Sequence, residues 1–240
     1  MLTISNIILL SPSCSPPFNS QYLDEMSKIV IDSHGIVDKY IGDAIMAFWN
    51  SPLRVLDHQI VSCRVALQSQ ERLRELHLVW KQRGFPLIKM RIGVHCGSVL
   101  VGNLGSPDRL HYTCIGVNVN LASLLEGLNK VYSTEILISE DIHGHAKSRY
   151  VCRPIDFIPA TKRRKETLLV YELVGAKELI RDEALHAIGI YNQAFESMVD
   201  GRVHEAEERF SEFLELVLDD RAAMKHLAKC REIQRRLGTP

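Results

Sequence analysis

A single carboxylate marks the first place in this sequence where chemistry could occur. Asp43 follows Gly42 and lies between two short apolar runs, Ile36 to Ile41 and Ala44 to Trp49. A Gly-Asp pair between two such runs predicts a tight β-hairpin with the carboxylate at its tip. The carboxylate could bind a hard cation such as Mg²⁺, or it could simply serve the turn. The residues alone leave both roles open.

Other sequence patterns with chemical meaning are weaker. The chain contains no G-x-x-x-x-G-K-[ST] motif, which argues against a P-loop NTPase. His143 and His145 lack further ligands at metal spacing, so a surface loop is favoured over a zinc site. The basic run from Lys162 to Lys165 could attract a polyphosphate, although charged loops are usually only solvated.

The composition restricts the class of protein. Lys and Arg together number 29, as do Asp and Glu, so no overall charge attracts nucleic acid or an anionic membrane. The six cysteines form no C-x-x-C pair and no zinc spacing, which is typical of reduced thiols and predicts a cytoplasmic location. No apolar run approaches the roughly 20 residues that would span a bilayer.

Helices and strands are predicted to alternate up to Gly175. We expect helices at 21–33, 57–82, 118–129 and 141–146, and strands at 36–41, 44–49, 135–139, 151–158 and 167–175, with three short β segments divided by glycines between 90 and 115. This alternation predicts an α/β or α+β domain with one mixed sheet covered by helices.

The chain is purely helical in pattern after Gly175. Ala206 and Phe210 have the A-x3-F spacing of a tetratricopeptide helix pair, a weak match because a single unit is present. Two arrangements are open for residues 176–240. They could form a helical hairpin that packs on the main domain or on a partner, or a solvated helical tail.

Four segments, read in order, together resemble one known family. They are VDKYIGDAIMAFW at 37–49, RIGVHCGSVLVGNLGS at 91–106, YTCIGVNVNLASLLEGLNK at 112–130 and RPIDFI at 153–158. This set resembles the catalytic domain of class III adenylate/guanylate cyclases of the bacterial type, over about residues 10 to 174. The resemblance implies a ferredoxin-like α+β fold for residues 1–175, with a mainly antiparallel sheet, followed by the helical extension at 176–240.

The resemblance also implies a reaction and a partner. Such domains dimerise head to tail, as a homodimer or as a heterodimer with a complete cyclase subunit, and form composite sites at the interface. The ribose 3′-oxygen of a nucleoside triphosphate attacks the α-phosphate and expels pyrophosphate. Two Mg²⁺ or Mn²⁺ ions would activate the attacking oxygen and neutralise the phosphates.

Four residues of this chain match functional positions of the family. Asp43 matches one of two metal-binding aspartates, and Asn120 matches an asparagine that orients the ribose. Lys39 and Thr113 match the base-reading pair, in which the lysine would meet adenine N1 and the hydroxyl the adenine amine. This pair favours ATP. An exposed strand lysine and a helix-surface or capping asparagine are the plain alternatives for Lys39 and Asn120.

The N-terminus departs from the family pattern. The second metal aspartate of the family ends its first strand, a few residues before a Thr-rich turn and an L-S-P segment. Leu10 to Pro12 matches that segment, and Leu2 to Ser5 is similar to the remnant of the turn. This register places the aspartate upstream of Met1, so we expect the domain to lack the family's first strand.

Three further positions also differ from the family. Leu124 replaces the arginine that stabilises phosphate charge in the transition state, and its leucine neighbours at 121, 125 and 128 suggest a widened apolar helix face. Val117 replaces an acidic residue at the start of the same helix. The phosphate-binding lysine falls at Thr161 or Lys162, and we predict Lys162 as the substrate-binding residue.

Two functional hypotheses follow from these matches and losses. The first is an adenylate cyclase-like domain that forms 3′,5′-cyclic AMP from ATP, with weak or absent activity in the chain as written. The second is an inactive pseudo-cyclase that acts as a regulatory or dimerisation partner.

Overall fold

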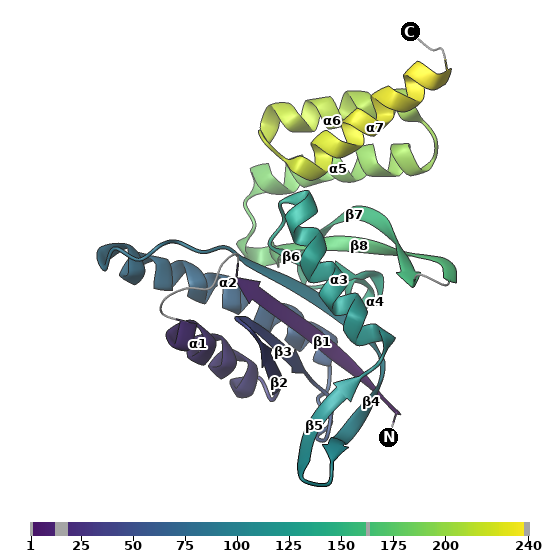
Figure 1. Ribbon diagram of the computed structural model, residues 1–240. Coiled ribbons are helices and arrows are strands. Elements are labelled where there is room, and N and C mark those ends of the chain that lie inside the picture. Colours follow the sequence, from purple (N-terminus) through teal and green to yellow (C-terminus); the bar gives the residue numbers. More distant parts are fainter. Residues whose placement is uncertain (1, 13–18, 162–163, 238–240) are drawn as a thin grey trace.

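One mixed sheet organises the molecule. The structure is a computed structural model that describes residues 2–12, 19–161 and 164–237 (Figure 1). Its strands are β1 (Leu2–Pro12), β2 (Ile36–Ile41), β3 (Ala44–Phe48), β4 (Met90–Ser106), β5 (Arg109–Ile115), β6 (Ile136–Ser139), β7 (Tyr150–Thr161) and β8 (Arg164–Ala176). Their order is β2-β3-β1-β4-β6-β8-β7, and β5 pairs with the far half of β4. Only the β4–β6 pair is parallel among the described strands, so the expected mainly antiparallel α+β class is confirmed.

Helices cover both faces of this sheet. They are α1 (Asn19–Asp32), α2 (His58–Gln82), α3 (Val117–Tyr132), α4 (Glu140–Ala146), α5 (Asp182–Val199), α6 (Val203–Leu216) and α7 (Arg221–Leu237). Helices α1, α2 and α4 enclose the main core on one face, where Tyr22, Met26 and Trp80 are fully buried. Helix α3 lies on the opposite face. Within the described ranges, none of the helices has both the length and the apolarity needed to cross a bilayer.

The N-terminal segment differs from the expectation that it is the remnant of a turn. Leu2–Pro12 forms β1, which lies between β3 and β4, with Ile7 opposite Phe48 and Leu10 opposite Ile45. A strand in this position must bury both of its faces. Ile8 and Leu10 join the core under α1 and α2, while Ile7 joins the cluster under α3. The apolar run therefore fills a strand position that the sequence analysis left empty.

Two glycines of β4, Gly93 and Gly97, mark close contact with α3 rather than the ends of strands. The sequence predicts separate β segments here, but β4 is a single strand of 17 residues. A Cβ added at Gly97 would lie 2.5 Å from the Asn118 side chain, and one at Gly93 would lie 2.2 Å from the Ala122 carbonyl oxygen. Glycine within a strand permits such an approach of another backbone.

The C-terminal helices pack on β7 and β8. Ile155 and Val170 of these strands share one apolar cluster with Tyr191, Phe210 and Phe213 of the helices. The junction also contains a buried polar contact, in which His226 Nε2 lies 2.7 Å from the Ile155 carbonyl oxygen. Figure 1 shows α5, α6 and α7 stacked against this end of the sheet.

A buried cation connects the extension to the sheet. Arg153 of β7 lies between two carboxylates, with its Nε 2.5 Å from Glu172 of β8 and an Nη 2.7 Å from Asp220, which precedes α7. Its guanidinium also stacks on the Tyr191 ring, 4.6 Å from the ring centroid. A guanidinium removed from water requires such pairing, because an unpaired buried charge is strongly destabilising.

Replacing Gly93 with alanine should destabilise the domain, because the new methyl group would collide with the α3 backbone. We expect the free energy of unfolding in urea to fall by about 1–3 kcal/mol or more, the usual effect of overpacking. Gly127→Ala is the matched control, since Gly127 is exposed on α3 and nothing lies within 4 Å of an added Cβ. That control should gain about 0.5–1 kcal/mol. Equal effects of the two substitutions would refute the close contact.

Asp220→Asn should weaken the attachment of the helical extension. Asparagine can still accept the Ala223 N–H bond that caps α7, so the substitution mainly removes the charge facing Arg153. Loss of a partner from a buried ion pair should lower the free energy of unfolding by about 1–3 kcal/mol, less than a full break because Glu172 remains. Glu232→Gln, in the exposed pair with Arg236, should cost about 0.5 kcal/mol or less in the same measurement. A loss no larger than that of the control would rule out a stabilising role.

Candidate functional site

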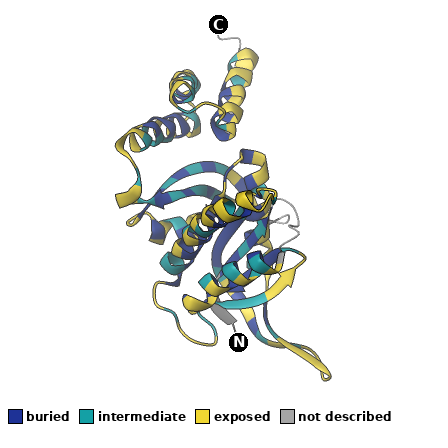
Figure 2. Ribbon diagram, turned by 90° about the vertical axis from the view of Figure 1, so that its left-hand side faces the viewer, coloured by how far each residue is buried: buried dark blue, intermediate teal, exposed yellow. Residues whose placement is uncertain are grey.

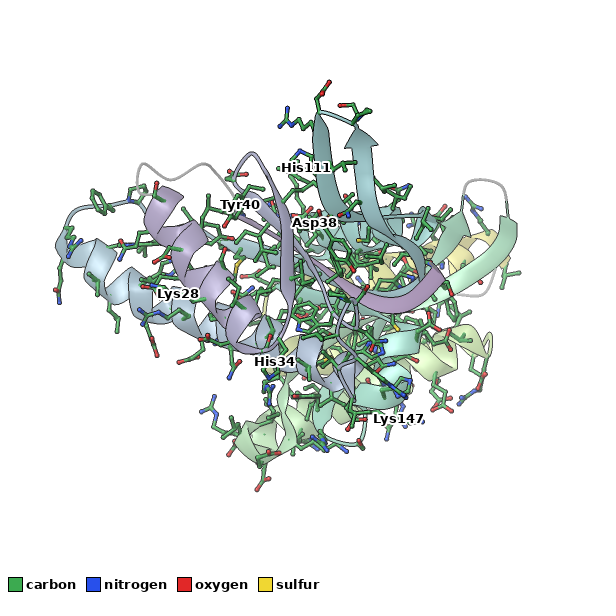
Figure 3. All side chains as sticks on the ribbon, turned by 90° about the horizontal axis from the view of Figure 1, so that it is seen from below. Lys28, His34, Asp38, Tyr40, His111 and Lys147 are labelled. Atoms are coloured by element: carbon green, nitrogen blue, oxygen red, sulfur yellow. The ribbon has the colours of Figure 1, made fainter. Side chains whose placement is uncertain are left out.

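Asp38 brings together two residues that lie 74 positions apart in the sequence, Lys39 and Thr113. Thr113 Oγ1 on β5 donates a hydrogen bond to Asp38 Oδ2 over 2.8 Å. Lys39 Nζ lies 3.7 Å from the other oxygen, Oδ1. The Asp38 side chain is only 1% exposed, whereas the Lys39 side chain is 46% exposed. Both residues predicted to read the base therefore contact one buried carboxylate. In Figure 3, Asp38 and Tyr40 lie on β2 beside the hairpin that carries His111.

A β-bulge accounts for the position of the Asp38 side chain. Val37 pairs with Ala47 and Lys39 pairs with Met46, so Asp38 is an additional residue in β2. A bulge interrupts the alternation of side chains and can redirect one of them toward a neighbouring element. Strand alternation alone therefore does not predict this contact of Asp38, although an acidic residue directly before Lys39 in an apolar run is a signal that could identify it.

Cys114 adds a third contact to this carboxylate. Its Sγ lies 4.0 Å from Asp38 Oδ2. Burial, and then the nearby charge of Asp38, raises the pKa of the Cys114 thiol to about 12. The thiol is therefore neutral at physiological pH and can act as a weak donor to the carboxylate.

Asp43 lies at the tip of the β2–β3 hairpin, as predicted. Gly42 has a φ of 64°, a left-handed conformation that favours glycine, and Ile41 pairs with Ala44 across the turn. The Asp43 side chain is half-buried. Burial and then the charge of Asp43 raise the pKa of Tyr22 on α1.

Asp43 does not belong to a larger cluster of metal-ligating side chains within the described residues. Residues 2–12, 19–161 and 164–237 contain no group of three or more His, Cys, Asp or Glu side chains that could hold a metal. β1 runs beside β3 toward this hairpin, and the pairing of the two strands extends to Leu10 opposite Ile45.

Asn120 and Leu124 share the exposed face of α3. They are one helical turn apart, and Leu124 is 41% exposed, while Leu121 and Leu125 are buried. Leu124 therefore lies beside the buried stripe that passes through Leu121 and Leu125, and its place in a widened apolar face stays a prediction. Among the described hydrogen bonds, none joins Asn120 to Lys39 or Thr113.

The start of α3 is held by Asn118, although not as a helix cap. Its Nδ2 donates to the Ser98 carbonyl oxygen over 2.8 Å, and its Oδ1 lies 3.0 Å from His95 Nε2. The other ring nitrogen of His95 lies 2.9 Å from Ser139 Oγ. Burial lowers the pKa of His95, which favours the neutral ring in this network. The network fixes the first turn of α3 against β4 and so determines where Asn120 lies.

The predicted phosphate-binding residue cannot be placed. Lys162 lies outside the described residues, which resume at 164. Its role stays a prediction.

Exposed apolar side chains lie on the two strands that carry Lys39 and Thr113 and at the start of α3. They are Tyr40 and Ile41 on β2, Leu110 and Ile115 on β5, and Val117 at the start of α3. Figure 2 shows that the projecting β4–β5 hairpin is exposed toward its tip. Apolar side chains concentrated next to a polar site are typical of a surface that contacts another protein.

Comparison with known proteins reveals relatives of this chain. Residues 20–173 match the family described as the adenylate and guanylate cyclase catalytic domain. The chain is 37% identical over 156 residues to adenylate cyclase 1 of Rhizobium meliloti (strain 1021), which covers 65% of this chain and 23% of that protein. It is 27% identical over 218 residues to the terminal-differentiation specific adenylate cyclase of Dictyostelium discoideum, covering 89% of this chain and 10% of that protein.

Solved structures show the same fold. The adenylyl cyclase CyaB from P. aeruginosa matches with a TM-score of 0.66 at 25% identity, covering 75% of this chain and 98% of that one. The guanylyl cyclase Cya2 matches with a TM-score of 0.62 at 23% identity, covering 75% and 96%. This chain spans less than a quarter of either sequence relative, so both relatives are much longer proteins. The family match covers well over half of the chain, which therefore belongs to the adenylate and guanylate cyclase catalytic domain family.

Proposed function

We propose that this chain is an adenylate cyclase-like domain that binds ATP through Lys39 and Thr113. The observation that carries the proposal is the meeting of these side chains on the Asp38 carboxylate. The two base-reading positions inferred from the family resemblance lie on different strands, and here they are held close to each other. A pair of polar groups with fixed positions is what recognition of a base edge requires.

The chemistry of the pair suits adenine. The Lys39 ammonium can only donate hydrogen bonds, so it complements the N1 acceptor of adenine. The Thr113 hydroxyl can accept a hydrogen bond from the adenine amino group. Guanine has the opposite groups at both positions, a carbonyl at C6 and a proton on N1. The pair therefore favours ATP over GTP.

Formation of 3′,5′-cyclic AMP by the 240-residue chain is proposed to be weak or absent. Asn120 could orient the ribose whose 3′-oxygen attacks the α-phosphate, but Leu124 on the same face has no hydrogen-bond donor for the phosphate. Loss of an arginine that stabilises phosphoryl charge costs on the order of 10³-fold or more in rate. Mg²⁺ or Mn²⁺ would supply charge neutralisation in this family, and Asp43 is the carboxylate that could contact such an ion.

The site is proposed to be completed by a second chain. The exposed apolar side chains on β2, β5 and the start of α3 support a head-to-tail homodimer or a heterodimer with a complete cyclase subunit. In the heterodimer, this chain would supply Lys39, Thr113 and Asn120 to the shared site.

An inactive pseudo-cyclase is the second candidate. Leu124 favours it, because a leucine at that position has no donor for the phosphate, and so does the register of the resemblance, which places the second metal aspartate upstream of Met1. In this function the domain would bind nucleotide or a cyclase partner and influence that partner without turnover.

Lys39→Met should weaken ATP binding by about 10- to 100-fold, because a charge-assisted hydrogen bond to the base is lost. Titration of the purified chain with ATP and Mn²⁺ in a calorimeter measures this loss. Lys28→Met is the matched control, since Lys28 is an exposed lysine on α1 that pairs with Asp24. ATP binding that is unaffected by Lys39→Met, or not detected in the unmodified chain, would contradict the proposed site.

Leu124→Arg should raise cyclic AMP production with Mn²⁺ and ATP by at least about tenfold, because it restores a donor for the phosphate on the Asn120 face. Ser123→Arg, also exposed on α3, adds the same charge one position away and should leave the rate unchanged.

Asp43→Ala added to the Leu124→Arg variant should abolish the gained activity, because it removes the carboxylate proposed to contact the metal. If the unmodified chain already makes cyclic AMP at a substantial rate that Asp43→Ala abolishes, the proposal of weak activity is wrong.

A further inference from the structure

The Asp38 carboxylate determines the direction of the Thr113 hydroxyl group. A carboxylate has only acceptor oxygens, so the 2.8 Å contact requires Thr113 to donate its single proton. The Asp38 side chain is 1% exposed, so water cannot easily replace the hydroxyl as its partner. The direction of this hydrogen bond is therefore fixed by the surrounding structure.

This arrangement leaves the Thr113 oxygen as an acceptor. A hydroxyl that has donated its proton retains two lone pairs. Among the described hydrogen bonds, none donates to Thr113 Oγ1. A ligand that approaches this oxygen must therefore bring a donor.

Lys39 lies beside the same carboxylate and offers hydrogen-bond donors, whereas Thr113 offers an acceptor. Its ammonium lies 3.7 Å from Asp38 Oδ1, and about half of the side chain is exposed. An ammonium has donors and no acceptor. The site thus combines one acceptor and one donor, and Asp38 contacts both.

We propose that Asp38 is a positioning residue that makes this site select a 6-amino purine over a 6-oxo purine, by holding the proton of Thr113 away from the base. This inference rests on the proposed function, because it assumes that the base meets Lys39 and Thr113. Adenine has an amino donor at C6 and an acceptor at N1, which match the acceptor and the donor of the site. Hypoxanthine has a carbonyl at C6 and a proton on N1, so both contacts would be repulsive.

Asp38→Asn tests the inference with little change in size. An asparagine can turn its amide group toward Thr113, which then accepts that bond and can donate its own proton to a carbonyl at C6. The variant should therefore lose discrimination between the two bases. If Asp38 had only a structural role, the substitution would weaken the binding of both nucleotides to the same extent.

The measurement compares ATP with inosine triphosphate, which differs from ATP only in the groups at C6 and N1. Both are titrated with Mn²⁺ into the full chain. We expect the unmodified chain to prefer ATP by about tenfold or more, since each unpaired polar group in a site carries a substantial penalty. Asp38→Asn should reduce the preference to about threefold or less, mainly through tighter binding of inosine triphosphate.

Two matched variants isolate the Thr113 hydroxyl. Thr113→Ser retains the hydroxyl and should keep the preference for ATP. Thr113→Val removes the acceptor and should weaken the binding of ATP without strengthening the binding of inosine triphosphate. Cys114→Ala removes only the weak thiol contact to Asp38 and should leave the preference nearly unchanged.

The outcomes separate this inference from the proposed function. If the unmodified chain binds neither nucleotide, both fail. If ATP binding depends on Lys39 but Asp38→Asn leaves the ratio of the two affinities unchanged, the proposed function stands and the role of Asp38 is refuted. A preference that falls in Asp38→Asn and persists in Thr113→Ser supports the inference.

Discussion

The close contact between α3 and β4 is the constraint on which most of the candidate site depends. Gly93 leaves room for the α3 backbone, and Gly97 leaves room for the Asn118 side chain, so a larger residue at either position would collide with the helix. Asn118 then bridges the helix start to His95 and to the Ser98 carbonyl oxygen. The rotation of α3 follows from these contacts. It places Leu121 and Leu125 inside and Asn120 and Leu124 outside.

The two buried charge clusters have different effects. At Asp38 the carboxylate is enclosed while its lysine partner is half exposed, so the cation remains accessible to a ligand. At Arg153 the guanidinium and both carboxylates are largely enclosed, and the cluster has little contact with solvent. The first arrangement is suited to recognition. The second is suited to holding the helical extension against the sheet, since buried ion pairs give defined geometry more reliably than they give stability.

The elements with strong local patterns could be predicted from the sequence. The Gly-Asp turn located the β2–β3 hairpin and its carboxylate, and helical spacing located α1, α2 and α3 within a few residues. The family resemblance supplied Lys39 and Thr113 as the proposed base-reading positions. What could not be predicted depends on pairing between distant segments. β1 is a strand because β3 and β4 both pair with it, and the exposure of Leu124 depends on which face of α3 meets β4. Asp38 was missed because its bulge arises from the register with β3.

The bulge also has a consequence for the sheet as a whole. β2 is the last strand on its side of the sheet, so its outer edge carries backbone groups that another chain could pair with. An additional residue twists the edge, and the exposed charge of Lys39 makes a flat, apolar pairing surface unfavourable there. The irregularity that holds the candidate site should therefore also protect the protein against edge-to-edge aggregation.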